Sequence, residues 1–289
     1  MKKIIAATLF FIITNLSAQI SYTGFLDKYP IELVTYMYSD GVGKAIYTYS
    51  NFDTPIILEG ILKKNTLTLL EKDKNEKKTA KMTFQSYDEK NKELIGVWTD
   101  LTSGKELKIK LTKTFDVEDE KSSEWRNKEI LQPYSLKDKY FKLLISKTKE
   151  SGTGVTGVKI IEKKTDKLIQ KIDLNVQLWS LDNIGVGDFN FDGIQDFSVF
   201  ESSYAGPNTS KLYFLYNPKT GKYFESSYSG TSLEFDSKTK RIHEHNQCCA
   251  GSKHINAEYK VVNNKMVLVK QTCLELDLKT GDFKKVKCD

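Results

Sequence analysis

Short runs in which apolar and polar residues alternate fill the N-terminal part of the chain. The clearest run is "ELKIKLTK", where Leu107, Ile109 and Leu111 fall on one face of an extended strand and lysines on the other. Turn signals such as "DG" at residues 40–41 separate the runs. The pattern predicts an N-terminal domain over residues 19–113, a meander of about eight antiparallel strands that closes, or nearly closes, into a small barrel, because closure removes exposed strand edges.

The alternation lapses between residues 114 and 137, where "FDVEDEKSSEWRNKEILQPYSLK" mixes an acidic cluster, serines and a proline. This composition is typical of a linker between domains. Within it, residues 123–131 are compatible with one helical turn.

Strand signals resume in residues 138–289, the predicted C-terminal domain. A Lys-Thr turn recurs there in "EKKTDKL", "NPKTGKY", "DSKTKRI" and "DLKTGDF". In two of these turns glycine follows the threonine, where a short hairpin loop needs a positive φ angle. The irregular spacing excludes a strict tandem repeat. We expect successive hairpins forming antiparallel sheets in a propeller-like or sandwich arrangement, so the whole chain is predicted to be all-β.

Residues 1–18 have the layout of a cleaved secretory signal: two lysines, an apolar run and a small-residue ending before Gln19. The apolar run, Ile4 to Ile13, is too short to span a bilayer. No later segment is apolar enough for a membrane helix, so no transmembrane segment is expected. The sequence therefore predicts an exported protein, periplasmic or secreted, with cleavage near Ala18.

The charge of the chain is mild. Removing the signal lowers the formal net charge of +6 by two, since Lys2 and Lys3 are lost and no acid is. The remaining lysines alternate with glutamates and aspartates along the predicted strands, which indicates solvated faces. We expect no nucleic-acid partner, because no recognition motif accompanies the charge.

All four cysteines lie near the C-terminus: Cys248, Cys249, Cys273 and Cys288. An exported chain meets an oxidising compartment, so two disulfides are expected, with three possible connectivities. Adjacent cysteines rarely bond each other, because the ring strains the peptide between them. We therefore expect Cys248 and Cys249 to pair with Cys273 and Cys288, in an order that the sequence leaves open.

The stretch "DFNFDGIQD" places oxygen donors at alternate positions around Gly193. The donors are Asp188, Asn190, Asp192, the carbonyl of Ile194, and Asp196. Ca²⁺ takes six to eight oxygen ligands, and alternate residues of a tight loop supply them. Val199 stands where an EF-hand has its glutamate, and the flanks are typical of strands. The loop predicts a structural Ca²⁺ site and not a sensor; the alternative is a turn whose side chains cap their own amides.

The stretch "HEHNQCC" offers His243 and His245 beside two cysteines, and His254 follows. Side chains two apart share a strand face, so a zinc or copper site is chemically possible. Oxidised cysteines cannot act as thiolate ligands, and the spacing matches no closed zinc template. A disulfide-rich hairpin with exposed histidines is therefore favoured.

No enzyme motif stands out. The chain has no Gly-x-Ser-x-Gly elbow, His-Glu-x-x-His motif or phosphate loop. Nothing singles out a catalytic pair of carboxylates among the 38 acidic residues. A non-enzymatic role is predicted.

A candidate partner-binding loop, "ESSYAGPNTSK", follows the strand after the aspartate-rich stretch. Small polar residues with one aromatic suit a loop that probes the cleft of another protein. The alternative is an ordinary hairpin connection, and "SSYSGTS" at residues 226–232 is equally ambiguous. The candidate contact residues are Ser202, Ser203, Tyr204, Gly206 and Asn208.

The aspartate-rich stretch through "LYFLYNPKTGKYF", together with "NQCCAG" and "KMVLVKQTC", resembles a family of exported bacterial proteins with a calcium loop in a propeller-like β-domain. Its best-known members are immunity proteins against lysozyme-like peptidoglycan hydrolases, and they are similar to periplasmic inhibitors of invertebrate-type lysozyme. The resemblance covers residues 139–273. It implies calcium ligation by Asp188, Asn190, Asp192 and Asp196, and no target-binding motif carries over.

Three hypotheses follow. The first is a non-enzymatic exported Ca²⁺-binding protein that binds a protein partner, namely a lysozyme-like peptidoglycan hydrolase. The second is small-ligand or glycan binding, which in the barrel needs an apolar cavity and is disfavoured if Phe84 and Trp98 fill the interior. The third is a cell-envelope hydrolase, which needs a cleft with converging carboxylates.

Overall fold

The computed structural model describes residues 18–50, 54–118, 124–150, 152–204 and 206–288. The predicted signal, apart from its last residue, lies outside these ranges. Every strand pair in the described chain is antiparallel, and the only helical element there is one 3₁₀ turn, η1 (Cys249–Gly251). None of the described segments forms a helix long and apolar enough to cross a membrane. The predicted all-β class is confirmed.

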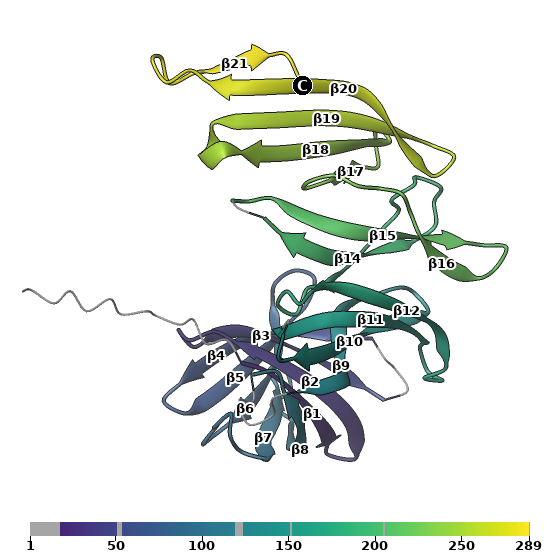
Figure 1. Ribbon diagram of the computed structural model, residues 1–289. Helices are drawn as coiled ribbons and strands as arrows, with labels where there is room; N and C mark the ends of the chain where they lie inside the picture. The colour runs from purple at the N-terminus through teal and green to yellow at the C-terminus, as the bar shows by residue number, and fades with distance from the viewer. Residues whose placement is uncertain (1–17, 51–53, 119–123, 151, 205, 289) are drawn as a thin grey trace, which may run out of the picture.

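The first eight strands form a closed barrel (Figure 1). Each strand pairs with the next, and β1 pairs with β8 to close the ring, as the alternating pattern predicted. Their bounds are β1 (Ala18–Leu26), β2 (Tyr29–Met37), β3 (Val42–Tyr49), β4 (Ile56–Lys63), β5 (Thr66–Lys72), β6 (Lys78–Phe84), β7 (Glu93–Asp100) and β8 (Glu106–Asp116).

Side chains from all eight strands fill the barrel interior. Phe84 is fully buried there, Ile109 and Leu111 of the predicted apolar face are buried beside it, and Trp98 packs against the same cluster. The interior of an eight-stranded barrel is narrow, and large side chains fill it completely. This packing counts against the hypothesis of a small-ligand cavity in the barrel.

Three further antiparallel sheets follow, each built from consecutive strands, as in the blades of a propeller (Figure 1). The first contains β9 (Trp125–Ser135), β10 (Lys139–Thr148), β11 (Gly152–Glu162) and β12 (Leu168–Gln177). The second contains β13 (Ile184–Gly187), β14 (Asp196–Ser203), β15 (Thr209–Asn217) and β16 (Lys222–Glu225). The third contains β17 (Glu234–Asp236), β18 (Arg241–Cys248), β19 (Lys253–Val262), β20 (Lys265–Leu276) and β21 (Phe283–Val286).

The segment predicted as a linker contains a strand. Residues 125–135 form β9, so the helical turn expected at residues 123–131 is wrong for its described part. β9 is the edge strand of its sheet, and its pairing with β10 shifts register around Pro133. A proline is tolerated at an edge or a bulge because no ladder hydrogen bond is needed there. This placement explains why the alternation lapses although the backbone is extended.

One apolar cluster joins the barrel to the sheets that follow. Val34 and Ile46 face outward from β2 and β3 and are buried, and they pack in the same cluster as Ile130 of β9 and Phe197 of β14. A partly buried ion pair helps to fix this junction: Lys142 Nζ lies 2.6 Å from Glu32 Oε2. The barrel and the first two sheets therefore share a continuous core.

Candidate functional site: the aspartate loop and the serine hollow

The aspartate loop, residues 188–196, connects β13 to β14. Asp188 accepts two backbone N–H groups, from Asp192 at 3.0 Å and from Gly193 at 2.8 Å. Asp192 accepts the N–H of Ile194 at 2.8 Å. Gly193 has a φ of 88°, a conformation that costs glycine nothing and other residues more. The loop lies between strands, as the sequence predicted, and its side chains cap its own amides.

Asp196 is the buried member of the loop. Its side chain has no exposed surface, and its two oxygens accept the N–H groups of Phe189 at 2.9 Å and Tyr216 at 2.8 Å. Burial raises the pKa of Asp196 to about 6; the two N–H bonds oppose this rise, and the charges of Asp192 and Asp188 add to it. The loop thus concentrates negative charge in a partly apolar setting.

The aspartate loop contacts the third sheet. The Asn190 side chain donates to Asn264 Oδ1 at 3.0 Å, in the turn between β19 and β20. Phe189 and Phe191 pack against Phe235 of β17, with ring centroids 4.7 Å and 6.3 Å apart. The loop therefore lies where the second and third sheets meet, a position suited to fastening the two sheets together.

The donor set of the loop fits a hard cation in its chemistry. Among the described residues, the carboxylates of Asp188, Asp192 and Asp196 accept from backbone and amide N–H groups and from no lysine or arginine. Tyr228 adds a second observation: its hydroxyl is buried without a hydrogen-bond partner in the described chain. Burial and then the charges of those same three aspartates raise the Tyr228 pKa, so the hydroxyl lies within reach of their field.

The side chains of the aspartate loop do not form a complete set of metal ligands in this conformation. No three His, Cys, Asp or Glu side chains in the described ranges converge closely enough to hold a metal ion. In the aspartate loop the Asn190 amide donates to Asp192 Oδ2 at 2.9 Å, which occupies an oxygen that a cation would need. Cation binding would require this amide to turn, with the carbonyls of Asn190 and Ile194 completing the oxygen set.

The predicted partner-binding loop lies at the other end of β14. Asp196 begins that strand and Ser203 ends it, so seven rises, about 23 Å, separate them. The partner-binding loop therefore follows the outgoing strand of the aspartate loop, as the sequence indicated, but lies a full strand length away from it. The two are linked through aromatic rings instead: Phe189 packs on Tyr213 at 5.0 Å, and Tyr213 packs on Tyr228 at 6.1 Å.

Both serine-rich stretches border one depression, the serine hollow, of about 400 Å³. Tyr204 comes from the first stretch, and Ser227 to Thr231 come from the second, which passes beside the start of β15. The hollow is lined by hydroxyls, by the ring of Tyr228, by two carboxylates, and by Lys211 and Leu212. Its principal lining residues are Glu201, Tyr204, Ser210, Glu225, Ser227 and Tyr228.

The predicted contact residues do not share one role. Tyr204 is 53% exposed, and its hydroxyl lies 3.2 Å from Ser210 Oγ. Ser202 bonds the same Ser210 hydroxyl, and the Ser203 N–H donates to Gln177. Gly206 is exposed with a φ of 80°. Asn208 is buried instead: its amide donates to Gln247 O at 2.6 Å and anchors the loop to β18.

Sequence reasoning missed Trp179. It is 48% exposed in the segment after β12, and its ring packs on Phe200 of β14 with centroids 4.9 Å apart. The bond from the Ser203 N–H to Gln177 brings this segment to the end of β14 that leads into Tyr204. The only signal in the sequence was the tryptophan itself, and it lay in a flanking run that was interpreted as a strand.

The histidines do not form a metal site in the described chain. His245 Nδ1 lies 3.1 Å from Asn256 Oδ1, and His254 Nε2 lies 3.2 Å from the Gly251 carbonyl. The His254 ring also meets the edge of Phe283. His243 pairs in register with Glu258. These contacts are structural.

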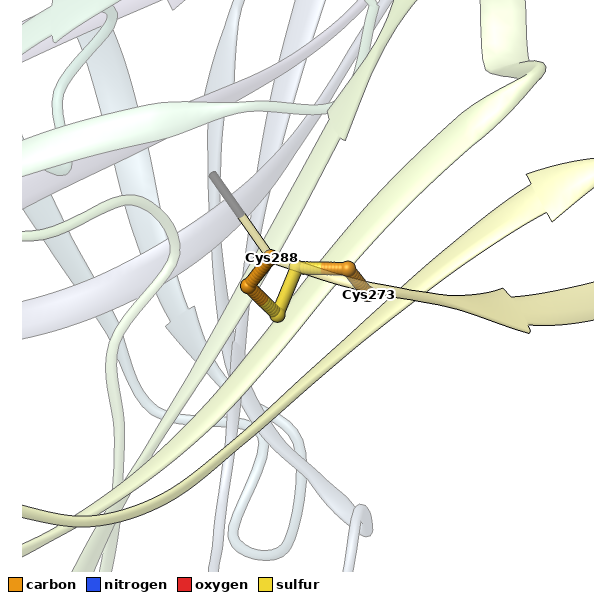
Figure 2. The surroundings of a disulfide bond; sticks show 2 residues. All are labelled: Cys273 and Cys288. Carbon is orange, nitrogen blue, oxygen red and sulfur yellow. A yellow bond between two sulfur atoms is a disulfide. The ribbon is translucent and has the colours of Figure 1, made fainter.

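The cysteine pairing differs from the prediction. Cys273 bonds Cys288, with Cα atoms 5.3 Å apart (Figure 2), while Cys248 and Cys249 are not bonded to either. The reason is register: Cys273 lies opposite Val286 on β21, so Cys288 follows directly and lies within reach. The pair at the end of β18 lies next to Lys253 and not next to Cys273.

No protein-family model matches the chain, and no curated protein matches it. Among solved structures, a Xanthomonas type IV secretion system related protein aligns over 94% of this chain and 99% of its own, at 12% identity and a TM-score of 0.27. A Lactobacillus plantarum protein aligns over 93% and 95%, at 12% identity and a TM-score of 0.26. The β-propeller domain of the Trilobed protease from Pyrococcus furiosus aligns over 95% and 85%, at 9% identity and a TM-score of 0.23. At such TM-scores these likenesses carry no conclusion about fold or function, and the family resemblance stays a prediction.

Proposed function

We propose that this chain is an exported, non-enzymatic, calcium-binding protein that binds a protein partner through the rim of the serine hollow. The partner that we propose is a lysozyme-like peptidoglycan hydrolase, on the sequence resemblance of residues 139–273. The observation that supports binding at this rim is that Tyr204 and two serine-rich stretches line it. The segment that carries the exposed Trp179 is held to the same end of β14 by the bond from Ser203 to Gln177.

Exposed aromatic side chains on a firm base are the usual anchors of a protein interface, and small hydroxyl residues around them supply adaptable hydrogen bonds. Trp179 rests on Phe200, and the Tyr204 hydroxyl meets Ser210, so both anchors are positioned before binding. Pre-positioned anchors lose little conformational entropy on association.

We propose further that Asp188, Asn190, Asp192, the Ile194 carbonyl and Asp196 hold Ca²⁺. Bound Ca²⁺ would neutralise the clustered carboxylates. This would fasten the second sheet to the third through Phe189 and Phe191.

The first test is capture of a partner from native envelope and culture fluid, followed by inhibition assays against a panel of lysozyme-type enzymes. Trp179→Ala and Tyr204→Ala should each weaken binding by about 30-fold, as expected for an anchor worth about 2 kcal/mol. The matched control is Tyr134→Ala, since Tyr134 is 47% exposed on β9 and lies outside the hollow. Equal loss in the control, or no inhibition and no co-purifying hydrolase, would refute the proposal.

One observation favours a second candidate, a cell-envelope hydrolase: Glu201 and Glu225 line the same hollow. Paired carboxylates can cleave glycosidic bonds. Turnover of peptidoglycan by the wild-type protein that is lost in Glu201→Gln and Glu225→Gln would replace the binding role with a catalytic one. We expect no turnover.

A further inference from the structure

The turn between β18 and β19, residues 248–252, holds two exposed cysteines side by side. The Sγ atoms of Cys248 and Cys249 lie 2.9 Å apart. A covalent S–S bond is about 2.05 Å long, and unbonded carbon atoms, which are smaller than sulfur, pack at about 3.5–4.0 Å. The two sulfurs therefore lie inside ordinary contact distance, and a small rotation of either side chain would join them.

The backbone of this turn presents both thiols outward. Cys249 and Ala250 have φ angles of 56° and 52°, and Gly251 follows at 83°. Ser252 closes the turn, because its hydroxyl and its N–H both donate to the Cys249 carbonyl, at 2.7 Å and 3.2 Å. The other two cysteines are already bonded to each other. Each thiol thus has the other as its nearest thiol partner in the described chain.

A bond between adjacent cysteines is strained and hence reducible. Their Cα atoms are about 3.8 Å apart across a trans peptide, whereas unstrained disulfides span about 4.4–6.8 Å. The Cys273–Cys288 bond, at 5.3 Å between Cα atoms, falls inside that range. The chain therefore carries one disulfide of ordinary geometry and one pair whose bond would open more easily.

We propose that Cys248 and Cys249 form a redox site that closes reversibly into a vicinal disulfide by exchange with low-molecular-weight disulfides. One cysteine thiolate attacks a sulfur of the small disulfide, whose S–S bond breaks and releases one thiolate. The neighbouring cysteine thiolate then attacks the protein sulfur of the mixed disulfide and releases the second. The two cysteines lose two electrons and two protons, and the small disulfide is reduced to two thiols. This site is independent of the proposed function.

The test uses the full-length protein, equilibrated natively with graded ratios of reduced and oxidised glutathione, acid-quenched, alkylated and digested with trypsin. Cleavage after Arg241 and Lys253 isolates both cysteines on one peptide, residues 242–253, while Cys273 and Cys288 fall on two others. Under oxidising ratios that peptide should lose two hydrogens and carry no alkyl group. Under reducing ratios it should gain two alkyl groups while Cys273–Cys288 stays linked.

Cys249→Ser provides the matched variant, because it keeps the first thiol and removes the second. It should accumulate one glutathione on Cys248 under the oxidising ratios, whereas the wild type should not. Two alkyl groups on residues 242–253 at every ratio would overturn the proposal. So would a cross-link from this peptide to Cys273 or Cys288, or opening of both disulfides at the same ratio.

Discussion

Among single residues, the aspartates of the aspartate loop differ from Asp236, another turn aspartate, because each has further carboxylates close to it. Asp236 also caps its own turn, accepting the N–H groups of Lys238 and Thr239, but it stands alone. Asp188 and Asp192 cap theirs beside the buried Asp196, and their charges raise its pKa. The same local hydrogen bonding therefore leaves three neighbouring carboxylates in one loop and a single capped carboxylate in the other.

We predict that Ca²⁺ raises the melting temperature of the wild-type protein and that Asp188→Ala and Asp192→Ala abolish the rise. Binding to the folded state at ten times Kd stabilises by about 1.4 kcal/mol, and sites in extracellular modules bind at about 10⁻⁴ to 10⁻³ M. Thermal melts with Ca²⁺ and with chelator measure the difference. Asp236→Ala is the control, since it loses comparable turn bonds and should keep the Ca²⁺ response. Identical wild-type melts in both conditions would show that the loop is only a capped turn.

The sequence predicted the place and local form of this loop, because alternation of oxygen donors around Gly193 is a short-range property. It could not predict Trp179 as an exposed anchor or Asn208 as a buried one. Those roles depend on which segments meet at the end of β14 and on the bond from Asn208 to Gln247, which lies far along the chain. The predicted cysteine pairing was wrong for the same reason, since the actual pairing depends on the register of β20 with β21.

At the level of strands, the barrel closes through a close approach of β1 to β8. A Cβ atom added to Gly24 would lie 2.2 Å from the Lys110 carbonyl oxygen and 2.8 Å from the Leu111 Cα. Both obstacles are backbone atoms of the neighbouring strand, which cannot turn aside as a flexible side chain could. Glycine at position 24 therefore allows β1 to pair closely with β8 and close the barrel.

We predict that Gly24→Ala lowers the free energy of unfolding by about 1–3 kcal/mol, the usual cost of overpacking. Chemical denaturation followed by tryptophan fluorescence measures it. Gly154→Ala is the matched control, because Gly154 also lies in a strand but a Cβ there would meet only the Val176 carbonyl at 3.4 Å. That variant should be unchanged or slightly more stable, since alanine restricts the unfolded chain. Equal effects from both substitutions would contradict the role of Gly24 in closure.

Among the strands, those with clean alternation were predictable, and β8 is the best case: Ile109 and Leu111 are buried as expected. Strand β9 could not be predicted in this way, because Pro133 and the acidic residues before it suggest a linker. Its strand character comes from pairing with β10 and from burial of Ile130 and Leu131 against the barrel, which are long-range contacts. Tertiary contacts thus overrode the local signal.

For the whole molecule, the arrangement of barrel and sheets depends on a patch of the barrel's outer surface. Val34, Ile46 and Ile57 lie side by side across β2, β3 and β4 in register. Val34 and Ile46 are buried beneath the following sheets, whereas Ile57 is 44% exposed. Outward-facing residues on the same barrel therefore divide into those covered by the next sheet and those left in solvent. Coverage of this patch predicts that the barrel and the following sheets unfold cooperatively.

We predict that Ile46→Ala lowers the free energy of unfolding by about 2–5 kcal/mol, because it leaves a cavity in the core shared by the barrel and the sheets. Ile57→Ala makes the same chemical change on the adjoining strand, in solvent, and should cost about 0.5 kcal/mol or less. Differential scanning calorimetry distinguishes the two variants. The wild type and Ile57→Ala should melt in one main transition. Ile46→Ala should melt at a lower temperature, with separate transitions for the barrel and the sheets. If Ile46→Ala lowered the melting of the barrel alone, with the sheets unmoved, the shared cluster would not couple them, and the barrel would be an independent domain.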